Sequence, residues 1–347
     1  MSTEKEVTIY DIAKQLDISP ATVSRGLKDH PAISKKTKKM IFDLVDKLGY
    51  QSNHFARNLR NQKTHTIGVI VPRLNSNFMS SVIAGIESYA NNQGYNLIIS
   101  QSSESAAKEA ANAKTMYNNR VDGLLVSLAY DTKELSHFKS LLKKNTPVIF
   151  FDRVMEHKDC TNVLINNRKA AYEATTHLIE QGCKRIVHVT APPLQNVYVD
   201  RLQGYKQALE EYHLPFSEDY VIIDNLSQES GVRAAEIIVK MDPLPDGVFV
   251  ANDNCAVSCL LALKQRGIRI PEDIAIVGFN NDLISTVVEP NLSTITYPGY
   301  EMGEVAARHL IDHLNGLSNI TTTNTIILRS EFLARASSLK RKPEENG

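Results

Sequence analysis

The stretch DISPATVSRGL, residues 17–27, decides how the start of the chain is interpreted. Ser19 can supply an N-cap oxygen, and Pro20 suits the first helical position, where a backbone N–H would have no partner in any case. The stretch therefore predicts a helix that begins at Pro20. Val23 and Leu27 would lie on its inner face. The outer side and leading end would carry Pro20, Ala21, Thr22, Ser24 and Arg25.

Two further helices are predicted on either side of this stretch. The first begins after Thr8, because Asp11 follows three residues later in the order of a capping box. The third begins after Ser34, and we expect Gly26 to end the middle helix early. The apolar residues that recur at helical spacing are Ile9, Ile12, Ala13 and Leu16 in the first helix and Ile41, Leu44, Val45 and Leu48 in the third. The outer face of the third helix bears Lys35, Lys36, Lys38 and Lys39.

A helix, a tight turn, a second helix and a supporting helix form the helix-turn-helix arrangement, whose second helix enters the major groove of DNA. Small side chains on that helix allow close approach to base edges, and an arginine such as Arg25 can donate two hydrogen bonds to guanine. A small helical bundle with a solvated face is the alternative interpretation.

Charge separates the start of the chain from the rest. Residues 1–63 hold 12 Lys and Arg against 7 Asp and Glu, a net charge of +5, whereas residues 64–347 hold 27 against 32, a net charge of −5. A basic head on a mildly acidic body indicates that the head contacts a polyanion.

The next stretch, QSNHFARNLRNQKTHT, residues 51–66, has room for one short helix from about Asn53 to Leu59. Leu59 stands between Arg57 and Arg60. An apolar side chain flanked by arginines suits insertion into the minor groove, where it unstacks a base step. A plain linker is the alternative.

From Thr66 onward, short apolar strands alternate with amphipathic helices. The strands are TIGVIV, NLIIS, GLLVS, PVIFF and NVLI in a first series and RIVHV, YVIID, GVFVA and IAIVGF in a second. Continuous apolar strands with helices between them predict parallel sheets that are covered on both faces. The length of this region favours two doubly wound lobes over one.

Ligands of such sheets bind beyond the carboxyl ends of the strands. Amides, carboxylates, an arginine and a phenylalanine follow the predicted strands, and such groups suit a polyhydroxylated ligand. These are Asn77, Phe78, Asp152, Arg153, Asn166, Asn167, Asn252, Asp253, Asn280, Asn281 and Asp282. Asn and Asp also favour turns for their own reasons, which is the alternative for each of them.

The chain resembles the lactose-repressor (LacI/GalR) family of bacterial transcription regulators. The resemblance is carried by TIYDIAKQLDISPATVSRGL, the Gly49-Tyr50 junction, NHFARNL, RVDGLLV, HLIEQGCKRI, RLQGY, VFVANDN and PEDIAIVGFNN, so it covers nearly the whole chain. It implies an all-α helix-turn-helix head and an α/β body of two lobes like that of periplasmic binding proteins. It also implies that Pro20, Ala21 and Arg25 read operator bases and that Leu59 wedges into the central step of a palindrome.

The pattern and the resemblance together predict two sets of contacts. The predicted DNA contacts are Thr8, Ser19, Pro20, Ala21, Thr22, Ser24, Arg25, Ser34, Thr37, Tyr50, Asn53, Ala56, Arg57 and Leu59. The predicted effector contacts are Asn77, Phe78, Asp152, Arg153, Asn166, Gln195, Val197, Arg201, Leu226, Asn252, Asp253 and Asn280. Arg201 stands where the family has its ligand-gripping arginine.

The chain departs from the family at several positions. Ser52 stands where the hinge usually has proline, and Asn166 and Asn280 stand where relatives commonly have aspartate. Gln195 and Val197 differ from the purine-responsive pattern. We therefore expect a neutral or partly anionic sugar derivative as effector.

The expected domains are a helix-turn-helix head over 1–50, a hinge over 51–64, a first lobe over 65–163 and 293–324, a second lobe over 164–292 and 325–340, and a polar tail over 341–347. The tail lacks a leucine heptad, so a tetramer built on a terminal coiled coil is not expected.

Enzyme motifs are missing: there is no GxGxxG, GxxxxGK[ST], GxSxG or HExxH. His309 and His313 have metal-ligand spacing, but the sequence offers no third ligand, so neither a metal nor a cofactor is expected. Cys255 and Cys259 are expected in the core. The apolar runs are too short to cross a membrane, and no secretory signal is apparent, so we expect a cytoplasmic, nucleoid-associated bacterial protein.

The sequence thus predicts a ligand-controlled transcriptional repressor that binds a palindromic double-stranded DNA operator as a homodimer. A stand-alone sugar-binding protein of transport and, less favoured, a sugar-modifying enzyme are the alternatives. Whether a second protein acts as co-effector is left open.

Overall fold

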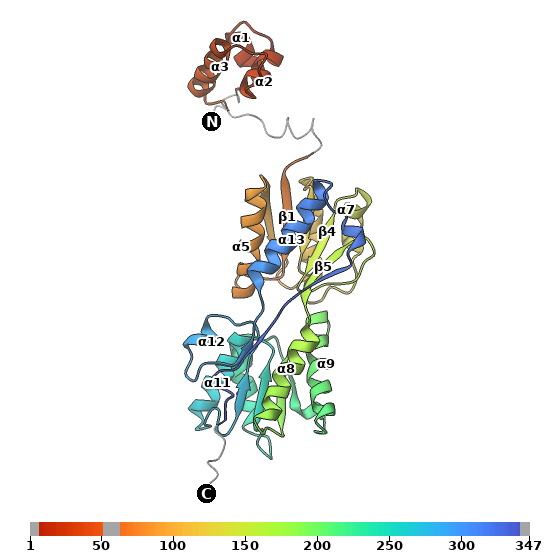
Figure 1. Ribbon diagram of the computed structural model, residues 1–347, viewed down its shortest axis with the longest axis vertical. Coiled ribbons are helices and arrows are strands. Elements are labelled where there is room, and N and C mark those ends of the chain that lie inside the picture. Colours follow the sequence, from red (N-terminus) through yellow and green to blue (C-terminus); the bar gives the residue numbers. More distant parts are fainter. Residues whose placement is uncertain (1–6, 51–62, 341–347) are drawn as a thin grey trace. The chain divides into compact units, whose positions relative to one another are not determined.

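The computed structural model describes residues 7–50 and 63–340 of the chain. The chain divides into two compact units, a head that ends at Thr64 and a body that begins at His65 (Figure 1).

Residues 7–50 of the head form three helices, α1 (Ile9–Gln15), α2 (Pro20–Leu27) and α3 (Lys35–Leu48). All three predicted starts are confirmed. The side-chain oxygens of Thr8, Ser19 and Ser34 each accept a hydrogen bond from the backbone N–H three residues on, and Pro20 is the first residue of α2. These caps satisfy backbone donors that a helix cannot pair internally.

The core of the head is small. It consists of the buried side chains of Ile12, Ala13, Val23 and Ile41, with partly buried apolar residues around them. The prediction that Gly26 ends α2 is wrong, because α2 continues to Leu27 and Gly26 is buried within it. A Cβ atom on Gly26 would lie 2.4 Å from Cδ1 of Ile41. The glycine therefore serves close packing of α2 on α3 rather than a turn.

The described part of the body has two lobes, each with a parallel sheet between helices, as predicted (Figure 1). The sheet of the first lobe has the strand order β11-β5-β4-β3-β1-β2. Its strands are β1 (Thr66–Val71), β2 (Asn96–Gln101), β3 (Gly123–Val126), β4 (Val148–Phe151), β5 (Thr161–Ile165) and β11 (Thr325–Leu328). Its helices are α5 (Asn77–Asn92), α6 (Ala106–Asn118), η1 (Ser136–Phe138), α7 (Lys139–Lys143), α13 (Gly299–Leu314) and η3 (Ile320–Thr322).

The sheet of the second lobe has the order β7-β6-β8-β9. Its strands are β6 (Ile186–Thr190), β7 (Val221–Ile223), β8 (Gly247–Val250) and β9 (Ala275–Val277). Its helices are α8 (Asn167–Glu180), α9 (Asn196–Glu211), η2 (Glu218–Tyr220), α10 (Gln228–Ile238), α11 (Asp253–Gln265) and α12 (Ile284–Val287). All four cysteines are buried and free, so the prediction that Cys255 and Cys259 lie in the core is confirmed.

The chain passes between the lobes after β5, before α13 and after β11. The last passage differs from the predicted boundary, which assigned 325–340 to the second lobe. β11 instead pairs in parallel with β5, from Thr325 opposite Asn162 to Leu328 opposite Ile165. Only after β11 does the chain enter the second lobe, where β12 (Phe332–Leu333) pairs with β10 (Thr294–Ile295). The backbone groups of β5 decide this boundary, and the apolar pattern alone contains no such information.

Candidate functional sites

The outer side of α2 carries the side chains predicted to read DNA. Ala21 and Arg25 are exposed and Ser24 is partly exposed, whereas Val23 is fully buried. Among residues 7–50 the structure pairs Lys38 with Asp29, at 2.6 Å, and gives Arg25 no acidic partner. Lys38 is thus held by an ion pair and is not a free cation of the outer face of α3, unlike the exposed Lys35, Lys36 and Lys39.

The other predicted contacts of the described head cluster at helix starts. The hydroxyls of Ser19 and Thr22 lie 2.9 Å apart, and those of Ser34 and Thr37 lie 2.8 Å apart. The hydroxyl of Thr8 donates to the carboxylate of its capping partner at 2.6 Å. Unpaired backbone N–H groups at helix starts favour phosphate oxygens.

Tyr50 packs against the head core. The predicted contacts Asn53, Ala56, Arg57 and Leu59, and with them most of the hinge, lie outside the described residues.

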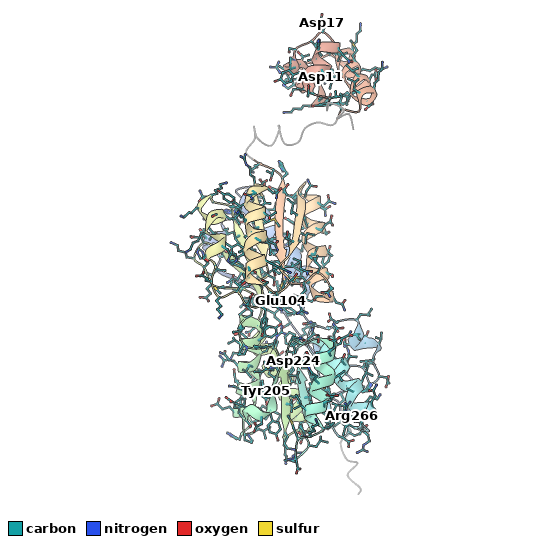
Figure 2. The ribbon with its side chains drawn as sticks, turned by 180° about the vertical axis from the view of Figure 1, so that it is seen from behind. Asp11, Asp17, Glu104, Tyr205, Asp224 and Arg266 are labelled. Carbon is teal, nitrogen blue, oxygen red and sulfur yellow. The ribbon has the colours of Figure 1, made fainter. Side chains whose placement is uncertain are left out.

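The body contains a cavity of about 680 Å³ that side chains of both lobes line. Figure 2 labels one lining residue of each lobe, Glu104 and Asp224, at the ends where the lobes face each other. Nine of the twelve predicted effector contacts line this cavity: Asn77, Phe78, Asp152, Arg153, Val197, Arg201, Leu226, Asn252 and Asn280.

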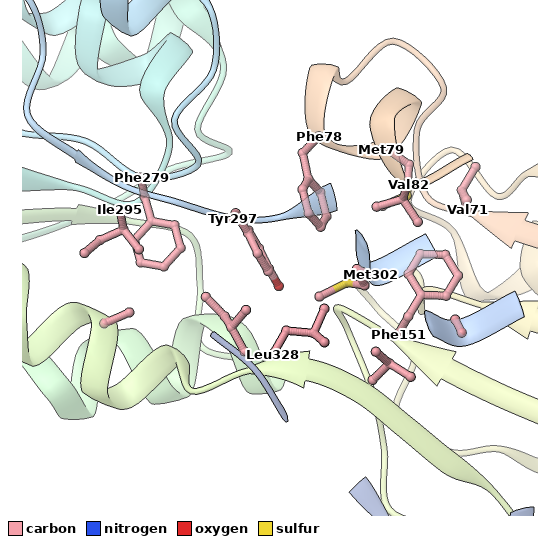
Figure 3. Close-up of a cluster of buried hydrophobic side chains, with 14 of the residues drawn as sticks. Val71, Phe78, Met79, Val82, Phe151, Phe279, Ile295, Tyr297, Met302 and Leu328 are labelled. Carbon is pink, nitrogen blue, oxygen red and sulfur yellow. The ribbon is translucent and has the colours of Figure 1, made fainter. Parts of the chain in front are cut away.

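An aromatic pair forms one side of the cavity. The rings of Phe78, at the start of α5, and Tyr297 are stacked with centroids 4.2 Å apart (Figure 3). The hydroxyl of Tyr297 donates to Oδ1 of Asp152 at 2.6 Å, and Ser127 donates to Oδ2 at 3.2 Å. Burial, with the charge of Asp152, raises the pKa of Tyr297, so the phenol stays protonated and donates. The pair offers a flat apolar face with polar groups at its rim.

Arg201 of α9 is a buried cation of the same cavity, and only 4% of it is exposed. Its Nε donates to Oδ1 of Asn167 and its Nη1 to the carbonyl oxygen of Ala251, both at 2.9 Å. The guanidinium also stacks on the ring of Phe279, 3.6 Å from the centroid. Burial lowers the pKa of Arg201 from its ordinary value, as expected for a cation without full solvation.

A second charged group borders the cavity on the side of the first lobe. Glu104 accepts hydrogen bonds from Arg73 at 3.1 Å and from Arg153 at 2.6 Å. Arg153 also donates to the hydroxyl of Tyr198 in the second lobe at 3.1 Å. These charges are paired with one another, which leaves Arg201 as the lining cation that has no salt bridge among residues 63–340.

Three predicted effector contacts do not line the cavity. Asn166 caps α8, where its Oδ1 accepts from the backbone N–H of Lys169. Gln195 is buried and donates to backbone carbonyls of the first lobe. Asp253 is fully buried, and its carboxylate accepts hydrogen bonds from the Thr294 hydroxyl and from the backbone N–H of Asp282. Burial raises the pKa of Asp253 to about 7 despite these bonds.

Sequence reasoning did not select several residues that line the cavity. They are chiefly Arg73, Glu104, Tyr130, Tyr198, Asn225 and Tyr297. Tyr198 could have been found, because it lies one helical turn before Arg201 on α9. Tyr130 and Tyr297 lie in loops, and no sequence period indicates where a loop side chain points.

In residues 7–50 and 63–340 no group of three His, Cys, Asp or Glu side chains could hold a metal ion. His313 contacts the backbone carbonyl oxygen of Ser318. None of the described helices combines the length and the apolar character that crossing a membrane requires.

Family models match the chain in two regions. Residues 8–53 match bacterial regulatory proteins of the lacI family, and residues 175–338 match a periplasmic binding protein-like domain. The chain is 33% identical over 310 residues to catabolite control protein A of Priestia megaterium, which covers 89% of this chain and 93% of that protein.

Two solved structures have the same fold. The lac repressor dimer bound to operator and the anti-inducer ONPF covers 96% of this chain and 100% of its own, with a TM-score of 0.85 at 22% identity. The transcriptional regulator CelR in complex with cellobiose has the same coverage, with a TM-score of 0.73 at 24% identity.

Proposed function

The chain belongs to the LacI family of bacterial regulatory proteins and is a DNA-binding transcriptional regulator, and on this premise we propose that it is a repressor controlled by a sugar or sugar derivative. In this proposal the effector occupies the cavity between the lobes, and the protein binds a near-palindromic operator as a homodimer.

The outer side of α2 supports the proposed operator contacts. Pro20 and Ala21 offer no hydrogen-bonding side chain, so they would contact thymine methyl groups. Arg25 is exposed and has no acidic partner in the described head, so its guanidinium is free to pair with a guanine. The residues at the helix starts would bind phosphates and fix the register.

The cavity supports the proposed effector class, and the stacked pair Phe78–Tyr297 beside Arg201 is the observation that carries it. An aromatic face suits the apolar face of a sugar ring, while the guanidinium and the amides of Asn252 and Asn280 suit its hydroxyls. CelR, which has the same fold, was solved with a sugar, cellobiose.

Exposed apolar side chains on the second lobe support the proposed homodimer. Leu283, the residue before α12, and Val287, its last residue, are 76% and 70% exposed, and Leu261 of the neighbouring α11 is 46% exposed. We expect a second copy of the chain to cover them, because large exposed apolar groups mark interaction surfaces. Sedimentation of the Leu283→Asp variant tests this, and a variant that stays dimeric would argue against this surface.

In the proposed mechanism the effector changes the orientation of the lobes, and the change alters how the two hinges of the dimer, residues 51–64, meet the operator. Such control requires that the effector bind one lobe arrangement better than the other.

Thermal melting of the full chain with a panel of sugars, sugar phosphates and nucleosides tests the effector class. A sugar at 100 times its Kd stabilises the folded body by about 2.7 kcal/mol. A sugar that stabilises the chain is then included in gel-shift assays with the DNA upstream of the gene that encodes it. A hit that leaves operator affinity unchanged would contradict control by that sugar, and stabilisation by nucleosides alone would contradict the effector class.

A further inference from the structure

One wall of the cavity joins the two lobes by polar contacts that do not involve a ligand. The first lobe contributes the segment after β3, residues 127–132, and the segment after β4, residues 152–154. The second lobe contributes residues 192–198, which lead from β6 into α9. We call these three segments the inter-lobe cluster.

Gln195 is the central side chain of the inter-lobe cluster. It is 2% exposed, and its Nε2 lies 3.1 Å from each of the carbonyl oxygens of Ala129, Tyr130 and Thr132. Although Gln195 stands at the N-cap position of α9, its side chain makes no capping hydrogen bond. The amide is thus directed at the other lobe instead of at its own helix.

Asn196 and Tyr130 extend the same contact. The Oδ1 atom of Asn196 accepts from the backbone N–H of Val154 at 2.9 Å, and its Nδ2 donates to the carbonyl oxygen of Asp152 at 3.1 Å. In the opposite direction, the Tyr130 hydroxyl donates to the carbonyl oxygen of Pro192 at 2.9 Å. Partly buried hydrogen bonds of this kind are costly to break where water cannot replace the lost partner, because each then leaves an unpaired polar group.

A buried carboxylate holds the loop that receives Gln195. Glu109 of α6 is fully buried and contacts this loop from the first lobe's own side. Its oxygens accept from the backbone N–H of Ala129 at 2.5 Å and from the Thr132 hydroxyl at 2.9 Å, and Nε2 of His137 lies 2.8 Å away. Residues 129–132 therefore lie between Glu109 of one lobe and Gln195 of the other.

We propose that Gln195 and Asn196 are positioning residues that hold the two lobes in one arrangement, and that Glu109 presents the loop carbonyls to Gln195. Gln195 does not line the cavity, whereas Tyr130, Asp152 and Arg153 of the same cluster do. An effector in contact with these three would act on the inter-lobe contact directly. This last step rests on the proposed function; the positioning role does not.

Hydrogen exchange of the full chain, followed by mass spectrometry without ligand or DNA, tests the positioning role. Gln195→Met removes the amide donors but keeps much of the volume, and Gln195→Glu places a carboxylate against three carbonyl oxygens. We expect exchange in residues 127–134 and 152–156 to be roughly tenfold faster in Gln195→Met and faster still in Gln195→Glu. Glu109→Gln is expected to accelerate exchange in 127–134 as well.

Gln207→Ala is the matched control. Gln207 lies on the same helix, but its side chain accepts a hydrogen bond from Arg168 within the second lobe. In the Gln207→Ala variant, backbone amide exchange in residues 127–134 and 152–156 should equal that of the wild type. Unchanged exchange in Gln195→Met, or equal acceleration across all peptides of the second lobe, would overturn the proposal. If Gln195→Glu does not fold, the comparison of Gln195→Met with Gln207→Ala decides. An effector screen that fails would leave this result intact, so the two proposals can fail separately.

Discussion

The head and the body of the protein present functional side chains in opposite ways. In the head, the predicted base contacts lie within the eight residues of α2, where Ala21 and Arg25 are exposed and Pro20 is partly exposed, above a core of four buried side chains. In the body, the cavity is lined by residues from Pro72 to Tyr297, and Arg201 and Tyr297 among them are buried. The comparison teaches that a surface of the kind predicted to contact DNA bases needs only one rigid helix, whereas a ligand cavity needs residues from segments that follow many strands. The first depends on a small core, and the second depends on a correctly assembled fold.

The largest effect is expected where the head is weakest. Ile41→Ala removes a fully buried side chain of α3 that packs against Gly26 of α2, at a cost of about 2–5 kcal/mol. A unit of this size has little stability to lose, so the head should unfold while the body stays folded. Two separate transitions in a thermal melt, with DNA binding lost, would confirm this. A single transition shifted for the whole chain would contradict the independence of the two units.

A somewhat smaller effect is expected in the cavity. Arg201→Lys keeps the positive charge but removes the planar guanidinium, which donates hydrogen bonds to Asn167 and to the carbonyl oxygen of Ala251. Affinity for a sugar found in the panel should fall by about 1.5–3 kcal/mol, measured by calorimetry. Arg185→Lys is the control, because Arg185 pairs with Asp246 away from the cavity. DNA binding without sugar should persist in both variants. If Arg201→Lys alone lost DNA binding, the assignment of effector binding to the body and DNA binding to the head would be contradicted.

Arg25→Ala tests the exposed reading surface. The variant should lose about 1–3 kcal/mol of discrimination at one base pair of each half-site, measured by gel shift on single-base operator variants. Lys36→Ala should instead weaken binding to all sequences alike and reduce its salt dependence. If Arg25→Ala retains full selectivity, the base-reading role assigned to Arg25 is wrong.

The smallest effect concerns the buried carboxyl of Asp253. Its pKa of about 7 in the folded chain lies above the ordinary value of 3.8. Between these values the folded state binds a proton that the unfolded state has released, so stability falls as pH rises and levels off above the folded pKa. We expect a loss of about 1 kcal/mol between pH 6 and pH 7. Urea unfolding should show this slope in the wild type and in the exposed control Asp219→Asn, but not in Asp253→Asn.

Much of the fold could be predicted from the sequence because the deciding signals are local. Thr8, Ser19 and Ser34 cap helices through atoms three residues away, and apolar strands between helices indicate parallel sheets. Gly26 misled the prediction because its role is contact with Ile41, which is distant in sequence. The lobe boundary at β11 was missed for the same kind of reason, since pairing with β5 is a long-range event.

The cavity was predictable only to the level of strand ends. Asp152, Asn252 and Asn280 could be placed there because the carboxyl ends of parallel strands meet at one edge. Tyr297 could not, since its ring is positioned by stacking on Phe78. Gln195 shows the converse: its position in the chain suggested the cavity, but three carbonyl oxygens of the other lobe orient its amide elsewhere.

The closeness of α2 and α3 at Gly26 limits how this protein can be retargeted to new DNA sequences. Residues 20, 21, 24 and 25 face outward or lie at the helix start, so an engineer can vary them in a library without disturbing the interior. Position 26 has less freedom, because an added methyl group would meet Cδ1 of the buried Ile41, and that side chain would have to shift within the core between α2 and α3. Libraries that randomise residues 20, 21, 24 and 25 and keep both the buried Val23 and glycine at 26 should therefore yield folded binders more often than libraries that include these two positions.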